Sequence, residues 1–263
     1  MDAEVVGLWE RAAETYETEV PYFRQMGERI VAHAALAPGE SVLDIACGKG
    51  ATIVPAARAV GPSGRVVGVD IVDAMVKAAA DAVTAEGLTN VEVMVMDGEA
   101  LTLPPESFDA VVMAFGLGFM HPGAVLSQVA RVLRRPGRLV TSVPAGGGPE
   151  WEFFGELCQK YELAPRAQPG GSRLPEPHEV AAMFGAAGFT LQPPTQESVS
   201  VTFPDEESWW RWVWSHGQRG FVEQLGDDRI GAFKADAFAA LRSFATPGGI
   251  PLEQRFLVLT ATI

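Results

Sequence analysis

Short runs of apolar, mostly β-branched residues alternate along the chain with helix-forming stretches. Near-continuous apolar runs are typical of strands whose two faces are both covered, and their alternation with helices indicates strand–helix–strand units that build a parallel sheet. The pattern therefore predicts an α/β fold. The predicted strands are Ser41 to Ala46, Arg65 to Asp70, Val91 to Met96, Phe108 to Phe115 and Arg138 to Val143, with a further strand-like run from Phe256 to Ile263.

Helix boundary signals fall between these strands. Asp73 is a favourable capping residue for a helix that ends near Gly87. A second helix is expected from about Gly123 to Leu133, before the Arg-Pro-Gly turn at 135–137. Both helices end where the chain must turn back to the sheet, which supports the alternating order.

The N-terminal segment has a different character from the rest of the chain. Residues 1–36 are predicted to form a helical cap of two helices, broken near Pro21, that covers either a site or the sheet. The remaining residues, 37–263, are expected to form the main domain.

The region after the fifth predicted strand contains fewer regular elements. Residues 144–171 are rich in glycine and proline and are predicted to form loops, and helical character returns at about 176–185. A helical insertion is expected at about 205–245, where four of the six tryptophans are found.

Composition and charge exclude several classes of protein. The 263 residues are 48% hydrophobic and 20% charged, which suits one large globular domain or a domain with an appendage. The formal charge of −13 would repel a phosphate backbone, so nucleic acid is not an expected partner. Cys47 and Cys158 lack the spacing of a zinc site or disulfide framework, so no metal is expected. No run of about 18 apolar residues predicts membrane insertion, and a cytoplasmic protein is expected.

A glycine-containing loop follows the first predicted strand. Gly48 and Gly50 remove side chains at the point where a ligand would approach the backbone. Asp70 lies twenty residues beyond Gly50, at the end of the next strand, where a carboxylate can accept hydrogen bonds from both hydroxyls of a ribose. The sequence therefore predicts a nucleoside cofactor.

Charge identifies the cofactor class. A dinucleotide fingerprint requires glycine or alanine where Ile53 stands, and Asp44 at the end of the strand would repel a pyrophosphate. No lysine followed by serine or threonine closes a glycine loop, which excludes a Walker loop. S-adenosylmethionine has no phosphate, and it carries an ammonium and a sulfonium that Asp44 can stabilise. Asp97, after the third strand, is the candidate acceptor for the adenine amine.

Five segments are similar, in order and spacing, to the motifs of class I S-adenosylmethionine-dependent methyltransferases. The chain most resembles the branch that contains the C-methyltransferases of ubiquinone and menaquinone biosynthesis and many natural-product methyltransferases. The resemblance covers roughly residues 35–145 and implies a Rossmann-like fold with a mostly parallel seven-stranded sheet and helices on both faces. The segments are Leu43 to Gly50, Val67 to Asp70, Asp97 to Ala100, Phe108 to Val111 and Leu133 to Leu139.

The resemblance also implies a set of cofactor-binding residues. Two positions depart from the family pattern: Ala46 replaces a frequent glycine, and Lys49 stands where threonine is common. Lys49 is expected either to reach the methionine carboxylate or to face solvent. The implied cofactor-binding residues are Asp44, Ala46, Gly48, Gly50, Asp70, Ile71, Asp97 and Gly98.

The implied activity is methyl transfer to oxygen, nitrogen or carbon of a small, aromatic or polycyclic, natural-product-like molecule. The protein is expected to act as a monomer or a homodimer. Two alternatives remain open at this stage. One is a same-fold enzyme that uses S-adenosylmethionine in a cyclisation or decarboxylation without methylation, and the other is a noncatalytic cofactor-binding protein.

Aromatic residues are the candidates for acceptor binding. The tryptophans at 209, 210, 212 and 214 could line a pocket or form core, and helical spacing places the pair 210 and 214 on a different face from the pair 209 and 212. The candidate acceptor-binding residues are Tyr16, Tyr22, Phe115, Trp210 and Trp214.

Two histidines are candidate general bases. His121 follows the fourth strand at the edge where open α/β sheets bind ligands, although a solvent-facing helix start is the alternative. His216 is the second candidate. The arginines at 131, 134, 135 and 138 could suggest an anion site, but cations at a helix C-terminus explain them better.

Overall fold

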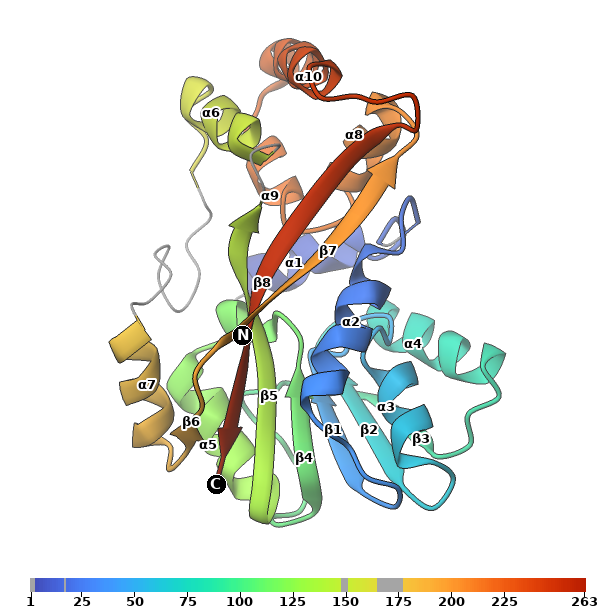
Figure 1. Ribbon diagram of the computed structural model, residues 1–263, viewed down its shortest axis with the longest axis vertical. Helices are drawn as coiled ribbons and strands as arrows, with labels where there is room; N and C mark the ends of the chain where they lie inside the picture. Colours follow the sequence, from blue (N-terminus) through green and yellow to red (C-terminus); the bar gives the residue numbers. More distant parts are fainter. Residues whose placement is uncertain (1–2, 17, 148–150, 165–176) are drawn as a thin grey trace.

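The computed structural model describes residues 3–16, 18–147, 151–164 and 177–263, and these residues form one mixed sheet with helices packed around it (Figure 1). The sheet order is β3-β2-β1-β4-β5-β8-β6, and β7 pairs with β8 outside this path. Neighbours from β3 to β5 are parallel, whereas β8 is antiparallel to β5, β6 and β7. The strands are β1 (Ser41–Ile45), β2 (Arg65–Asp70), β3 (Val91–Val95), β4 (Phe108–Met113), β5 (Leu133–Gly147), β6 (Thr190–Leu191), β7 (Thr195–Phe203) and β8 (Ile250–Thr262).

The Rossmann-like α/β fold is confirmed, with eight strands among the described residues instead of seven. The five predicted strands and the C-terminal strand are all present. The prediction was wrong about lengths in the second half, because β5 begins at Leu133 and β8 begins at Ile250. It also did not include β6 and β7.

Alternate residues of the central strands face two different cores, which explains their near-continuous apolar sequence. Val42 packs in one cluster with Ile30 of the N-terminal helices. Its neighbour Leu43 packs in the other cluster with Leu126 and Val129. Each face therefore requires apolar side chains at alternate positions.

Ten α-helices and one short 3₁₀ helix (η1, Gly116–Phe119) occur in the described residues. None of these helices has the length and apolar composition needed to cross a bilayer. The helices are α1 (Ala3–Ala12), α2 (Tyr22–His33), α3 (Ile53–Val60), α4 (Asp73–Ala85), α5 (Pro122–Val132), α6 (Glu152–Lys160), α7 (Pro177–Ala186), α8 (Glu206–Val213), α9 (Arg219–Val222) and α10 (Asp227–Arg242).

Most predicted helices are confirmed, including two N-terminal helices separated near Pro21. The prediction of loops over 144–171 was wrong where β5 continues to Gly147 and where α6 forms. The rest of that prediction, at 148–150 and 165–171, lies outside the described residues.

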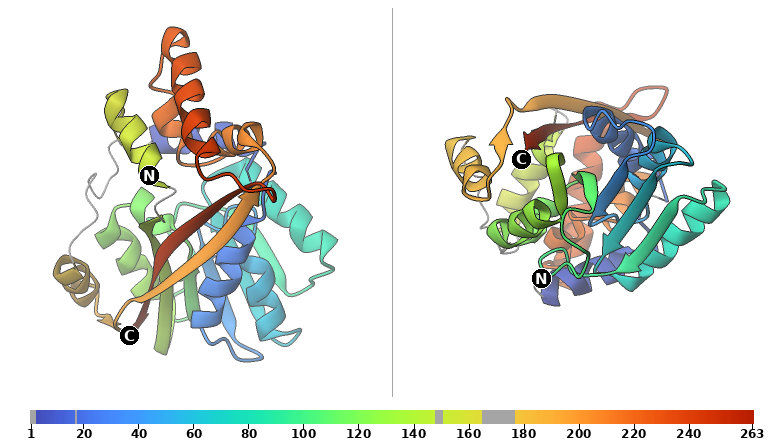
Figure 2. Two further views of the ribbon diagram at one scale, coloured as in Figure 1. Left: turned by 45° about the horizontal axis from the view of Figure 1, so that its top comes forward. Right: turned by 90° about the horizontal axis from the view of Figure 1, so that it is seen from below.

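The strands β7 and β8 form a long antiparallel ribbon that extends from the sheet to the C-terminal helices (Figures 1 and 2). Pro193 and Pro194 separate β6 from β7, and proline has no N–H to donate to a sheet. Trp209 and Trp212 of α8 are fully buried in the same cluster as Phe203 of the ribbon. These two tryptophans are therefore core residues of this half of the molecule.

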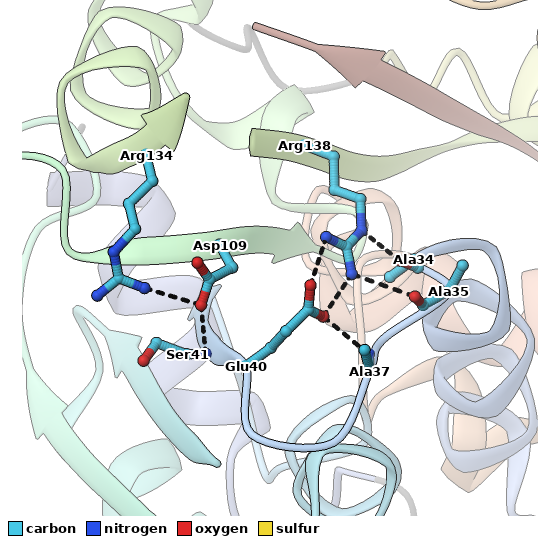
Figure 3. A network of polar contacts seen from close by, with 8 residues as sticks. All are labelled: Ala34, Ala35, Ala37, Glu40, Ser41, Asp109, Arg134 and Arg138. Atoms are coloured by element: carbon cyan, nitrogen blue, oxygen red, sulfur yellow. Dashed lines mark hydrogen bonds and ion pairs between the residues drawn. The ribbon is translucent and has the colours of Figure 1, made fainter. Parts of the chain in front are cut away.

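Arginine–carboxylate ion pairs link the N-terminal ends of β1 and β4 to β5, at the edge of the sheet away from the glycine loop (Figure 3). Glu40 accepts hydrogen bonds from Nη1 and Nη2 of Arg138 at 3.0 and 2.6 Å, and this guanidinium lowers the pKa of Glu40. Asp109 accepts from Arg134 at 2.8 Å. Arg131, in the last turn of α5, fits the prediction of helix C-terminal cations, and Arg138 donates to the carbonyl oxygens of Ala34 and Ala35 at the end of α2. Arg134 does not fit it, because it belongs to β5 and pairs with Asp109.

Candidate active site

The loop after β1 has a backbone shape that few side chains allow. Ala46, Gly48 and Gly50 have φ angles of 57°, 52° and 91°, in the left-handed region. A Cβ on Gly48 would meet no atom within 4 Å, so the backbone angle and not crowding favours glycine there. Ala46 adopts the same left-handed region although it has a Cβ, and this backbone conformation is energetically unfavourable for an L-residue.

Asp70 holds this loop from the end of β2. Its Oδ2 accepts a hydrogen bond from the N–H of Gly48 at 2.9 Å, and its Oδ1 accepts from the N–H of Val72 at 3.0 Å. Burial raises the pKa of Asp70, whereas these backbone bonds lower it in part. An ionised carboxylate offers about four lone-pair positions, so these backbone bonds, including one from Ile71, leave room for a further donor from a ligand.

Asp44 lies buried beneath the loop, with 1% of its surface exposed. Its Oδ2 accepts a short hydrogen bond from the hydroxyl of Thr52, and its Oδ1 has no partner among the described residues. Burial, together with the nearby charge of Asp70 and against the hydrogen bond from Thr52, raises the pKa of Asp44 to about 7. Near neutral pH this carboxylate would gain from a positive charge next to it.

A cavity of about 850 Å³, part of it open to solvent, lies at the carboxyl ends of β1 and β2. Asp70, Ile71 and the loop backbone belong to its lining. Aromatic side chains from three separate segments also line it. They are Trp9, Tyr16, Phe23, Phe115 and Phe119.

The aromatic wall is held together by ring contacts. Tyr16 stacks on Phe23 with ring centroids 4.4 Å apart, and Trp9 meets the ring of Phe119 edge-on at 5.3 Å. Lys49 of the loop donates a hydrogen bond from Nζ to the backbone carbonyl of Tyr16 at 3.0 Å. The N-terminal helices therefore close directly over the glycine loop.

Four of the predicted cofactor residues do not line the cavity. Asp97 and Gly98 lie outside the lining, as do Asp44 and Gly50. Asp97 accepts a hydrogen bond from the N–H of Glu99 at 2.9 Å, and Gly98 packs closely against Ile45 and Met120. These contacts show that the turn after β3 shapes the wall behind Met120.

The two histidines lie outside the lining as well. His121 caps α5, with 62% of its side chain exposed, and its backbone N–H and ring contact the carboxylate of Glu99. His216 is buried, its Nδ1 lies 2.6 Å from the carbonyl oxygen of Trp212, and burial lowers its pKa to about 3.

Of the predicted acceptor residues, Tyr16 and Phe115 line the cavity. Tyr22 is buried against Trp212 at a centroid distance of 5.3 Å, behind the lining. Trp210 and Trp214 contact each other at 6.0 Å on the partly exposed face of α8 and do not line the cavity.

Sequence reasoning missed several cavity residues, including Trp9, Phe23, Met26 and Thr52. Aromatic residues in the N-terminal cap were a usable signal, since Tyr16 was found in that way. Phe119 belongs to the segment after the fourth strand, where the sequence predicts that ligands bind, and it lines the cavity.

Comparison with known proteins identifies the family. A methyltransferase domain model matches residues 42–137. The nocamycin O-methyltransferase of Saccharothrix syringae is 33% identical over 261 residues, and the match covers 92% of each chain. The chain belongs to the class I S-adenosylmethionine-dependent methyltransferases. The resemblance noted from the sequence is thus confirmed, and other matching relatives are C-methyltransferases of ubiquinone and menaquinone biosynthesis.

Two further similarities extend this finding. The aklanonic acid methyltransferase of a Streptomyces species is 38% identical over 144 residues, which cover 54% of this chain and 65% of the relative. The crystal structure of YcgJ from Bacillus subtilis matches with a TM-score of 0.60 and 21% identity, covering 90% of this chain and 98% of the other. The latter likeness concerns the fold alone.

The residues at the cavity suit the cofactor of this methyltransferase family, S-adenosylmethionine. The unpartnered Oδ1 of Asp44 and the carboxylate of Asp70 provide negative charge for a cationic ligand. Aromatic faces opposite the loop stabilise cations as well. The lining offers apolar surface and few charges, as expected for a site that takes a nucleoside without phosphates.

Proposed function

We propose that this methyltransferase acts on an oxygen that is already acidic, a carboxylate or an acidic enol, of a small flat acceptor. The composition of the cavity lining carries the proposal. In the part of the chain that the structure describes, the lining contains no histidine and no glutamate. Its single aspartate, Asp70, is engaged with the glycine loop.

The lack of a histidine or glutamate in this lining favours an acceptor that needs no general base. An alcohol or an ammonium must lose a proton before it attacks, and this usually requires a positioned base. A carboxylate is ionised at neutral pH and can attack directly. Lys49 adds a positive charge to the same lining, which favours an anionic acceptor.

Two of the relatives support the same acceptor chemistry. One is named for O-methylation of nocamycin, and the other is named for methylation of aklanonic acid. The flat rings of Trp9, Tyr16 and Phe119 suit an aromatic or polycyclic body for the acceptor.

On the cofactor side, we assign the ribose hydroxyls to Asp70 and one adenine face to Ile71. The turn at Asp97 and Gly98 would close the adenine end, and Asp44 would stabilise the positive charge of the methionine half. The bound cofactor supplies a methyl group on a positively charged sulfur. The backbone of Ala46 and Gly48 would lie against it.

The chain contributes alignment and exclusion of water. The loop and Asp70 fix one reactant, and the aromatic wall holds the other at the carboxyl ends of the strands. Trp9 and Tyr16 close the cavity from the N-terminal side, which keeps solvent away from the reacting atoms.

The test uses S-adenosylmethionine with a labelled methyl group and three probes of one shape: anthracene carboxylate, hydroxyanthracene and aminoanthracene. We expect label in a base-labile methyl ester of the carboxylate, with an equal amount of S-adenosylhomocysteine. Label on nitrogen or carbon would overturn the proposal. Conversion of a probe without S-adenosylhomocysteine would instead favour the non-methylating alternative.

His121→Ala provides an internal check on the base-free reaction. Because His121 lies outside the cavity and pairs with Glu99, we expect turnover to stay within a few-fold of the wild type. A loss of about a hundredfold, together with loss of a histidine-like pH dependence, would restore His121 as the general base.

A further inference from the structure

A second group of polar atoms without partners lies behind the aromatic wall. Five buried side-chain nitrogen or oxygen atoms lack a hydrogen-bond partner among residues 3–16, 18–147, 151–164 and 177–263. One of them belongs to Asp44, and the other four are ring nitrogens of Trp151, Trp209, Trp212 and His216. Native proteins leave few such atoms, so four of them in one region require an explanation.

These four residues form one aromatic cluster. The rings of Trp212 and His216 are 3.9 Å apart, and Trp151 lies 5.5 Å from Trp212. Phe154 connects Trp151 to Trp209, at centroid distances of 6.5 and 6.3 Å. The unpartnered nitrogens therefore belong to one continuous patch of interior.

The cluster adjoins the cavity through one side chain. The ring of Phe23 lies 6.0 Å from that of His216, and Phe23 lines the cavity on its other side. Phe23 is only partly buried, and it stacks on Tyr16. Phe23 therefore borders both the cavity and the cluster, and an acceptor that reached the cluster would have to displace its ring.

The hydrogen-bonding roles of the cluster are defined by its neighbours. A carbonyl oxygen can only accept, so Nδ1 of His216 carries the proton that it donates to Trp212. Because burial keeps this imidazole neutral, Nε2 is an acceptor with a free lone pair. Each indole Nε1–H of the cluster is a donor without an acceptor in the described part of the chain.

We propose that His216, with the indole N–H group of Trp212, forms a recognition site for the oxygen substituents of a planar acceptor. Nε2 would accept from a hydroxyl, and the indole would donate to a ring carbonyl. The ligand class is a hydroxylated quinone or aryl ketone whose acidic oxygen lies in the cavity. The inference rests on the proposed function, since it places the far end of the same acceptor.

The test compares two probes by calorimetry with S-adenosylhomocysteine present. One probe is a dihydroxyanthraquinone carboxylate, and the other is anthracene carboxylate, which has the same ring shape without the ring oxygens. We expect the wild type to prefer the oxygenated probe by about tenfold or more, because a site with unpaired polar groups rejects a ligand that lacks the matching group. The visible band of the bound hydroxyquinone should also shift to the red.

Two variants locate the effect. His216→Leu should reduce the preference to about threefold or less and abolish the band shift. Trp210→Phe, on the partly exposed face of the same helix, should keep both. Affinity for S-adenosylhomocysteine should be unchanged in each variant. The melting temperature of His216→Leu should not fall, because the carbonyl of Trp212 still accepts from Ser215.

Equal binding of the two probes by the wild type would overturn the inference, and so would an unchanged preference in His216→Leu. If His216→Leu lowers the melting temperature and leaves probe binding unchanged, His216 has a structural role only, and a water molecule rather than the acceptor binds its Nε2. Ester formation on anthracene carboxylate would still support the proposed function in either case, so the two failures are distinguishable.

Discussion

Glu223 accepts hydrogen bonds from Nε and Nη2 of Arg11, at 3.0 and 2.8 Å, so that an ion pair joins α1 to the end of α9. Arg219 reinforces the pair, with Nε 2.7 Å from Glu223 and Nη1 2.9 Å from the carbonyl oxygen of Arg11. Trp9 of α1 lines the cavity. This ion pair therefore holds one wall of the cavity against the C-terminal helices.

Glu223→Gln should loosen that wall. The hydrogen bonds from Arg11 lower the pKa of Glu223 to about 2, so the stabilisation is complete above the unfolded pKa and is lost as pH falls toward the folded value. At neutral pH we expect faster hydrogen exchange over 3–16 and dissociation of S-adenosylhomocysteine about threefold faster or more.

Glu206→Gln is the matched control for this prediction. It removes an ion pair with Arg242, between α8 and α10, without touching α1. Equal exchange over 3–16 in the two variants would show that the Arg11 pair does not hold the wall.

Gly27 tests the contact between α2 and the glycine loop. A Cβ at this position would lie 2.2 Å from the carbonyl oxygen of Ala51, which lines the cavity. Gly27→Ala should therefore push α2 off the loop, lower the free energy of unfolding by about 1–3 kcal/mol and weaken binding of S-adenosylhomocysteine. Denaturant titration and calorimetry measure the two effects.

Gly231→Ala is the control for Gly27. It lies within α10, and a Cβ there would meet nothing within 4 Å. Alanine should raise stability by about 0.5–1 kcal/mol and leave cofactor affinity unchanged. If Gly27→Ala also raises stability and leaves cofactor affinity unchanged, the close approach of α2 to Ala51 does not determine either property.

Asp44 should make cofactor binding depend on pH. Burial raises its folded pKa to about 7, so the native state holds a proton that the unfolded chain has lost. Stability should thus fall as pH rises from the unfolded pKa through 7. A cationic ligand prefers the ionised form, so affinity for S-adenosylhomocysteine, which keeps the ammonium, should rise up to about tenfold from pH 6 to 8.

Asp44→Asn should remove both pH dependences while the fold persists. Stability at pH 8 should improve relative to the wild type, because the buried charge is gone. Calorimetry and thermal melts across this pH range test the prediction. An unchanged pH slope of binding in the variant would show that Asp44 does not interact with the ligand's charge.

Asp70 should contribute to cofactor affinity in two ways, through the ligand and through the loop. Asp70→Ala removes charge-assisted bonds of about 1.5–3 kcal/mol, so affinity should fall about tenfold or more. Asp70→Asn presents an NH₂ group to the N–H of either Gly48 or Val72, and it should also bind weakly. Undiminished affinity in calorimetry would contradict the ribose assignment.

The cofactor half of the site was predictable because its signals are local. Gly48 and Gly50 follow a strand, and Asp70 ends the next one, so parallel neighbours bring them together at one edge of the sheet. The backbone bond from Gly48 to Asp70 follows from that register. Few other residues have to be placed correctly for this geometry to form.

The acceptor half was not predictable in the same way, because packing between distant segments decides it. Helical spacing correctly separates Trp212 from Trp210, but only the packing of other segments decides that Trp212 is fully buried and Trp210 partly exposed. Lys49 binds the backbone carbonyl of Tyr16, and a backbone partner leaves no trace in the sequence. The strand β7 alternates polar and apolar residues after two prolines, so its pairing with β8 gave only a weak signal.

The continuity of β8 affects how the two halves of the molecule can move. Its C-terminal part pairs with β5 and β6 in the sheet, and its N-terminal part pairs with β7 up to Phe203, where α8 begins nearby. A hinge needs a few residues free of pairing, and β8 is paired along nearly its whole length. The helices at the far end of the ribbon must therefore move by bending and twisting of the paired strands β7 and β8. The stiffness of this ribbon limits how far these helices can separate from the glycine loop.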